Sequence, residues 1–300
     1  MDRSLFLNTK LTDDQVALFY LGQEGFLIKH KETYILIDPY LSDYVDQNCC
    51  TETVKWIRRY PAPISAEEFD FIDYVLCTHA HFDHSDPYTL SKLAKINSKA
   101  KFIAPKPIKD TILSYGIAED RFINALADEV LELNGCQIIP VPSAHEELRT
   151  DENGAYYDLG YKIIFGDTSI YHAGDCCIYD GLTERLMNID VLMVPVNGRS
   201  YYKRYVEDII GNMTCEEAII LAKETNAGMI VPMHYDLYDC NRINPALFVD
   251  CLFSMNPMQR FHMFAPGEFY IVQKQLNTRE KRGRINPTSF KVSYNSQKTV

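Results

Sequence analysis

Residues 78–86 read THAHFDHSD, and no packing requirement explains the density of metal-ligand types in this stretch. Because imidazole nitrogen and carboxylate oxygen bind zinc and the harder manganese and iron, the stretch predicts a metal site. A set spaced i, i+2, i+4 and i+5 cannot lie on one helical face, so we expect a loop folded around ions, and one loop could serve two of them. A polar loop that happens to be rich in histidine is the simpler alternative. The stretch directly follows the apolar residues 74–77, and its candidate ligands are His79, His81, Asp83 and His84.

Three more ligand-type residues each follow a short apolar or β-prone run, namely His145, Asp175 and His234. This pattern is expected when buried strands deliver functional side chains on the loops at their ends. Asp38 also ends an apolar run. It either accepts hydrogen bonds from the metal loop and fixes it, or is an ordinary turn aspartate at a strand end.

The remaining histidines, His30, His172 and His262, have ordinary explanations in a turn, the core and a late strand. His172 lies three residues before Asp175, so it is either a buried histidine with satisfied ring nitrogens or a partner of the ligands.

The apolar periodicity alternates strands with helices, which indicates an α/β protein. Asp86-Pro87 predicts the start of one helix, and Thr214 with Glu217 predicts a capping box for another. Residues 40–70 resemble an insertion over the active-site face, and the connection 197–212 is long enough to be functional. Strands are expected over residues 16–21, 25–30, 33–37, 73–77, 100–104, 136–142, 156–165, 168–172, 190–195, 228–233 and 268–272, and helices over 87–97, 106–115, 181–188, 214–225 and 245–254.

Composition favours a cytoplasmic enzyme without a membrane span. The chain has 300 residues, 46% of them apolar, which suffices for one catalytic domain over residues 1–273. No apolar run approaches the roughly 20 residues that span a bilayer, and the first ten residues lack the apolar core of a signal peptide. Nine cysteines without a CxxC pair indicate reduced thiols rather than a disulfide framework.

The net charge of −11 excludes a typical nucleic-acid surface, because phosphate backbones are held by clustered lysine and arginine. The charge is uneven, since residues 274–300 hold seven basic residues and one acidic residue. We interpret these residues as a basic, solvated C-terminal tail.

The order THAHFDH, a distant histidine, HAGD and PMHYD resembles the metallo-β-lactamase superfamily over most of residues 14–273. The resemblance implies a four-layer αβ/βα sandwich. Within the superfamily, the opening LGQEGFLI together with HAGD and PMHYD is most similar to the branch that contains L-ascorbate-6-phosphate lactonase.

The resemblance also implies a site for two divalent ions, zinc or manganese. His79, His81 and His145 would hold one ion, Asp83, His84 and His234 would hold the other, and Asp175 would bridge them. A water shared by two such ions is deprotonated near neutral pH, and the metal-bound hydroxide attacks a carbonyl or phosphoryl centre. Asp83 and Asp175 are then the catalytic carboxylates, and Tyr235, next to His234, is expected to support the ligands.

The candidates for substrate binding lie in the segment that follows another apolar strand. They are Asn197, Arg199 and Arg204. The arginine fork suits phosphate or carboxylate, although a solvated basic loop would have the same sequence. The leading hypothesis is a hydrolase that opens a lactone on a small phosphorylated or acidic sugar-type molecule, and the resemblance to the lactonase implies a homo-oligomer. The alternatives are a metal-dependent phosphodiesterase acting on a phospholipid or nucleotide, and a metal-binding sensor without enzymatic activity.

Overall fold

A computed structural model describes residues 1–273, so the predicted basic tail 274–300 lies outside the described residues. The strands form two mixed sheets. The first sheet has the order β13-β1-β2-β3-β4-β5-β6, with bounds Phe269–Gln273, Gln15–Gly22, Gly25–His30, Thr33–Ile37, Tyr74–Leu76, Lys101–Pro105 and Phe122–Ala125. The second has the order β12-β11-β10-β9-β8-β7, with bounds Met229–Met233, Val191–Pro195, Thr168–His172, Leu159–Phe165, Cys136–Pro142 and Leu131–Leu133.

Every strand and helix predicted from the sequence is present, with ends shifted by a few residues. Five further elements were not predicted: the strands β6 and β7, which are short and half-exposed, and the short helices α1, α2 and α6. The α-helices are α1 Arg3–Asn8, α2 Tyr44–Asn48, α3 Pro87–Ile96, α4 Lys109–Ser114, α5 Leu182–Arg185, α6 Tyr201–Tyr205, α7 Cys215–Glu224 and α8 Pro245–Met255, with 3₁₀ turns at Ala66–Glu68, Lys106–Ile108, Glu119–Arg121 and Asp239–Asn241.

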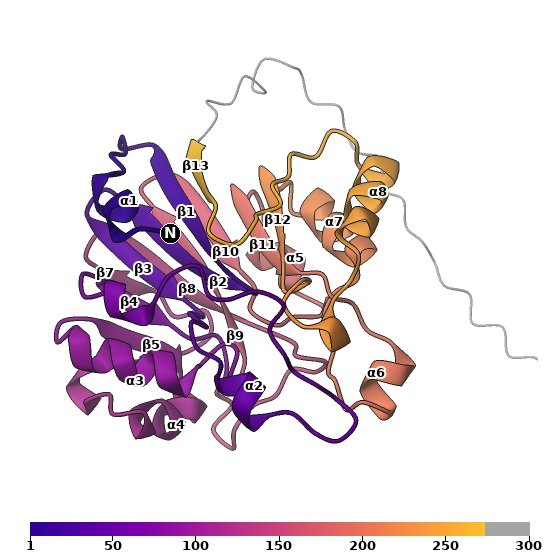
Figure 1. Cartoon of the computed structure of the whole chain (residues 1–300). Helices are drawn as coiled ribbons and strands as arrows, with labels where there is room; N and C mark the ends of the chain where they lie inside the picture. The colour runs from indigo at the N-terminus through magenta and orange to yellow at the C-terminus, as the bar shows by residue number, and fades with distance from the viewer. Residues whose placement is uncertain (274–300) are drawn as a thin grey trace, which may run out of the picture.

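The two sheets are stacked between helices (Figure 1), as the four-layer prediction requires. In β1, alternate side chains point to opposite faces. Val16, Leu18 and Tyr20 enter the core between the sheets, whereas Ala17 and Phe19 enter a second core that includes Leu90 and Leu93 of α3. On the other side of the molecule, α7 packs against β11 and β12, and α8 packs against α7 (Figure 1). The prediction of an αβ/βα sandwich is therefore confirmed.

Two helix starts predicted from the sequence are also confirmed. The Asp86 side chain accepts a hydrogen bond from the Tyr88 amide at the start of α3. Thr214 and Glu217 form the full capping box of α7. No helix within residues 1–273 is long and apolar enough to cross a membrane.

Strand direction brings the candidate ligands to one edge. In the first sheet, β1, β3 and β4 run the same way, because β2 is antiparallel to both β1 and β3 and β4 is parallel to β3. In the second sheet, β8, β10, β11 and β12 share one direction. Side chains that follow the carboxyl ends of such strands meet in the crevice where open α/β sheets bind ligands.

Candidate metal centre

The loop after β4 is held in place by Asp38, which follows β3. One Asp38 carboxylate oxygen accepts a hydrogen bond from the Thr78 amide at 2.8 Å. The other accepts from Thr78 Oγ1 at 2.6 Å and lies 2.8 Å from His84 Nδ1. All three residues are buried. Asp38 thus fixes both the start of the loop and the orientation of the His84 ring, so that Nε2 faces away from it.

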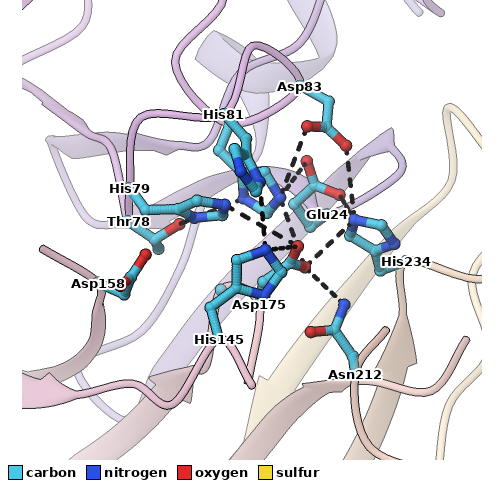
Figure 2. Close-up of polar contacts among 12 residues, drawn as sticks. Glu24, Thr78, His79, His81, Asp83, His145, Asp158, Asp175, Asn212 and His234 are labelled. Carbon is cyan, nitrogen blue, oxygen red and sulfur yellow. Dashed lines mark hydrogen bonds and ion pairs between the residues drawn. The ribbon is translucent and has the colours of Figure 1, made fainter. Parts of the chain in front are cut away.

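Two groups of side chains lie on the two sides of Asp175 (Figure 2). In each group, the candidate ligand atoms all lie within 4.8 Å of one another. The first group consists of His79, His81, His145 and Asp175, and the second of Glu24, Asp83, His84 and His234.

The first group is dominated by neutral imidazoles. His145 Nε2 lies 3.2 Å from His81 Nδ1 and 3.6 Å from Asp175 Oδ2, and His79 Nε2 lies 3.9 Å from the same oxygen. Burial lowers the pKa of His79 well below its usual range and lowers the pKa of His145 to about 3. Metal ligation requires unprotonated imidazole, so these rings are in the right state at neutral pH.

The second group mixes imidazoles with carboxylates. His234 Nε2 lies 3.5 Å from Asp83 Oδ2 and 3.6 Å from Glu24 Oε2, and His84 Nε2 lies 3.5 Å from Glu24 Oε1. Burial alone would lower the pKa of His84, but the carboxylates around it, Glu24 first, raise the pKa well above its usual range. Without an ion, these histidines act as the counter-charges of the carboxylates.

Asp175 connects the groups, because its two oxygens face different ones. Oδ2 faces His79 and His145, whereas Oδ1 lies 3.2 Å from His234 Nε2 and 3.5 Å from His84 Nε2. The side-chain amide of Asn212 donates to Oδ1 at 2.8 Å. Burial would raise the pKa of Asp175, but the surrounding histidines hold it well below its usual range, so the carboxylate is ionised.

The residues present suit divalent metal ions. Among the buried side-chain atoms of the described residues, His79 Nε2, His84 Nε2 and both oxygens of Glu24 have no hydrogen-bond partner. Buried polar atoms are rarely left without a partner. Because these atoms converge on the same small volume, ions bound there would satisfy all of them.

Three residues at the centre were not found by sequence reasoning: Gln23, Glu24 and Asn212. Gln23 donates its amide to Asp83 Oδ2 at 3.0 Å and lies 3.2 Å from His234 Nε2. The only sequence signal for Gln23 and Glu24 was the turn QEG between two apolar runs. Asn212 ends the connection 197–212, whose length was its only sequence signal.

A pocket of about 330 Å³ opens above the centre. On one side its lining includes five candidate ligands, His81, Asp83, His145, Asp175 and His234, and Asp208 and Asn241 add polar atoms. The remaining wall is apolar, and segment 40–70 contributes three of its residues. No lysine or arginine is among the lining residues. The apolar wall consists of Val45, Cys49, Trp56, Phe82, Ile209 and Ile210.

The candidate substrate-binding arginines are engaged elsewhere. Arg199 forms a two-pronged ion pair with Glu217 at 2.5 and 2.7 Å, and its Nη1 also donates to the Asn212 carbonyl at 2.9 Å. Arg204 pairs with Glu146 at 2.8 Å and with Asp208 at 3.1 Å. Binding an anionic substrate with either arginine would require breaking these pairs.

Asn197 and Tyr235 lie outside both groups as well. Asn197 donates to the side chain of Asn241 at 2.9 Å, so it supports a pocket residue from behind. The Tyr235 hydroxyl lies 3.5 Å from the Phe264 carbonyl and makes no hydrogen bond to a candidate ligand within residues 1–273.

The other histidines follow the ordinary interpretation. His172 is buried, with Nε2 2.7 Å from the Glu24 carbonyl and Nδ1 accepting from the Gly174 amide. Both ring nitrogens are therefore satisfied. His262 contacts Glu268, and His30 contacts the Asp13 carbonyl.

Comparison with known proteins is consistent with this geometry. The sequence profile described as Beta-lactamase superfamily domain matches residues 33–235. The chain is 28% identical over 260 residues to a protein named UPF0173 metal-dependent hydrolase from Methanoculleus marisnigri, covering 84% of this chain and 95% of the relative.

Two solved structures share the fold. The isothiocyanate hydrolase from Delia radicum gut bacteria has a TM-score of 0.69 at 18% identity, covering 86% of this chain and 100% of the other. Igni18, a metallo hydrolase from Ignicoccus hospitalis, has a TM-score of 0.66 at 22% identity, covering 87% of this chain and 100% of the other.

Proposed function

Because the chain belongs to the β-lactamase superfamily, we propose that it is a metal-dependent hydrolase whose centre holds two divalent ions, zinc or manganese. The observation that carries this proposal is the position of Asp175. Its two oxygens face two separate groups of ligand-type side chains at 3.2 to 3.9 Å. A carboxylate shared in this way is the arrangement that a two-metal site needs.

In the proposed centre, His79, His81 and His145 hold one ion, and Asp83, His84 and His234 hold the other. Two ions there would supply a water that is deprotonated near neutral pH and would polarise the bond under attack. Asp175 keeps the two groups together, and the Asn212 amide, 2.8 Å from Oδ1, fixes which way that carboxylate points. Asp38 plays the same role for His84, since ligating imidazoles are oriented by a carboxylate on the other ring nitrogen.

The lining of the pocket supports a small uncharged substrate. Lysine and arginine are absent from the lining, and the nearby Arg204 is paired with Glu146 and Asp208, so neither supplies a free cation for an anionic group. The apolar wall, which includes Trp56 and Phe82, suits an apolar group next to the scissile bond. We therefore propose an uncharged lactone or small ester rather than a phosphorylated sugar lactone. An apolar wall would also accept part of an organic phosphodiester, so that class is the second candidate.

A substrate panel tests this proposal. The metal-reconstituted protein should hydrolyse neutral lactones or esters, and removal of the metal with a chelator should abolish the activity until zinc or manganese is added back. Phosphorylated lactones of the same ring size and organic phosphodiesters complete the panel. Turnover of phosphodiesters alone would overturn the assignment to a carboxylic ester.

Arg199→Ala separates the two views of substrate charge. Arg199 contacts the Asn212 carbonyl, so its loss should lower kcat/KM for charged and neutral substrates alike. A selective loss on phosphorylated substrates, about tenfold or more as expected for a charge-assisted hydrogen bond, would mean that Arg199 leaves Glu217 to bind the anion. A cytoplasmic location and a homo-oligomer stay predictions of the sequence.

A further inference from the structure

Glu24 occupies an unusual place for a carboxylate. It lies in the two-residue turn between β1 and β2, before the segment matched by the superfamily profile begins at residue 33. Its side chain is 0% exposed, and neither carboxylate oxygen has a hydrogen-bond partner among the described residues. A buried carboxylate without donors is strongly disfavoured unless a charge or a metal compensates it.

The neighbours of Glu24 point to a metal ion as that compensation. Oε1 lies 3.5 Å from His84 Nε2, and Oε2 lies 3.6 Å from His234 Nε2. Two ligands that each lie about 2.1 Å from one ion in a tetrahedral arrangement are themselves about 3.4 Å apart. The spacing is therefore that of ligands around a common ion, and Figure 2 shows the Glu24 carboxylate turned toward His234 and Asp83.

The backbone of the turn is fixed against the second sheet. His172 Nε2 lies 2.7 Å from the Glu24 carbonyl, and the His234 amide donates to the Gln23 carbonyl at 2.8 Å. A Cβ at Gly25 would lie 3.0 Å from the Asp38 carbonyl, so a larger residue there would push the turn away. These contacts hold the Glu24 side chain next to His84 and His234 before any ion binds.

We propose that Glu24 is a direct ligand of the second ion, a role that rests on the proposed two-ion centre. Glu24 does not line the pocket, whereas Asp83 and His234 do. It therefore approaches the ion from the buried side and leaves the pocket side open to substrate. With Glu24, the second subsite contains two carboxylates besides Asp175, against three imidazoles in the first. Carboxylate-rich sites suit harder ions such as Mn²⁺, so the two subsites differ in metal preference.

The test is a titration of the full-length, metal-free protein with MnCl₂, in which free Mn²⁺ is followed by electron paramagnetic resonance. Wild type should bind two ions per chain. Glu24→Gln, which keeps the shape and removes the charge, should bind one ion normally and the second at least about tenfold more weakly, a typical cost of disturbing a metal ligand.

Asp236→Asn is the matched control. Asp236 lies two residues after His234, and its carboxylate accepts from the Tyr60 hydroxyl at 2.8 Å without belonging to either ligand group. The Asp236→Asn substitution removes the same charge from the same region. The variant should therefore bind both ions as wild type does. Equal weakening by both variants would assign the effect to overall charge and overturn the proposal.

Thermal unfolding distinguishes a ligand from a merely structural residue. Without metal, Glu24→Gln should unfold within a few degrees of wild type, because the Glu24 carboxylate accepts no hydrogen bond that glutamine would lose. With Mn²⁺, its midpoint should rise less than that of wild type. If Glu24→Gln is less stable without metal and binds both ions with wild-type affinity, Glu24 is not a ligand, and the proposed two-ion centre is unaffected. Wild type that binds fewer than two ions would overturn the two-ion centre and this proposal with it.

Discussion

The two halves of the centre both take ligands from the loop after β4, yet they differ in charge. On the side of His145, burial keeps three imidazoles neutral and ready to bind a metal. On the side of His234, Glu24 and Asp83 surround the histidines, and burial is outweighed by these carboxylates and Asp175, which raise the pKa of both rings. The comparison teaches that the site is not a symmetric pair of equal subsites. One half is preorganised as neutral donors, and the other is an ionic cluster that an ion would reorganise.

Replacing the residue common to both halves should have the largest effect. Asp175→Ala removes the side chain whose two oxygens face the two groups, so it should abolish hydrolysis and reduce the bound metal to less than one ion per chain. The loss of activity should exceed the about 10- to 100-fold typical for a supporting partner of a metal ligand. Activity assays and elemental analysis of the same preparation check this.

The fold should survive Asp175→Ala, because no large apolar side chain is removed. Circular dichroism serves as the control. Full metal content with unchanged turnover would show that Asp175 bridges nothing.

Replacing one histidine from each half should have a smaller and separable effect. His145→Ala should lose the ion of the imidazole-rich half, and His234→Ala the ion of the carboxylate-rich half, so each variant should retain about one ion. Adding Glu24→Gln to His145→Ala should then deplete the remaining ion, whereas adding it to His234→Ala should change little. Elemental analysis after dialysis measures all four variants, and equal depletion in both double variants would contradict two distinct halves.

The smallest expected effect is on pH-dependent stability without metal. Folding lowers the pKa of His145 from 6.5 to about 3. The unfolded chain therefore binds a proton at His145 that the folded protein does not, so this residue lowers the free energy of unfolding as the pH falls from 6.5 toward 3. Folding raises the pKa of His234 above 6.5. Protonated His234 therefore stabilises the folded protein below pH 6.5, and this stabilisation is lost as the pH rises through the pKa that the ring has in the folded protein.

Urea midpoints of His145→Gln and His234→Gln at about pH 5 and about pH 8 test these opposite signs. Relative to wild type, His145→Gln should be more stable at the lower pH than at the higher one, and His234→Gln should show the reverse. Shifts of the same sign in both variants would mean that the two halves share one electrostatic environment.

Much of the framework followed from local sequence. Apolar runs that end at His145, Asp175 and His234 predicted strands, and the structure brings the residues that follow them to one edge with the loop after β4. The caps at Asp86 and Thr214 could be predicted because they depend only on neighbours in the chain. Short edge strands such as β7 were missed because half-exposed residues carry little periodicity.

The rest depended on contacts between distant segments. In the sequence, Glu24 is indistinguishable from an ordinary turn residue. Only the tertiary fold shows that it lies next to His84 and His234. Arg199 seemed free to bind an anion because its partner Glu217 comes 18 residues later, in the first turn of the next helix. Asn212 reaches Asp175 across 37 residues of chain, and the length of the connection 197–212 does not indicate which of its residues makes that contact. Ion pairs and ligand contacts of this kind are set by the tertiary fold rather than by sequence patterns.

Anomalous diffraction from crystals soaked with MnCl₂ tests the central claim most directly. The account predicts two peaks about 3.5–4 Å apart, one on each side of the Asp175 carboxylate, with Glu24 bound to the peak next to His84 and His234. A single peak, or two peaks that do not share Asp175, would contradict it.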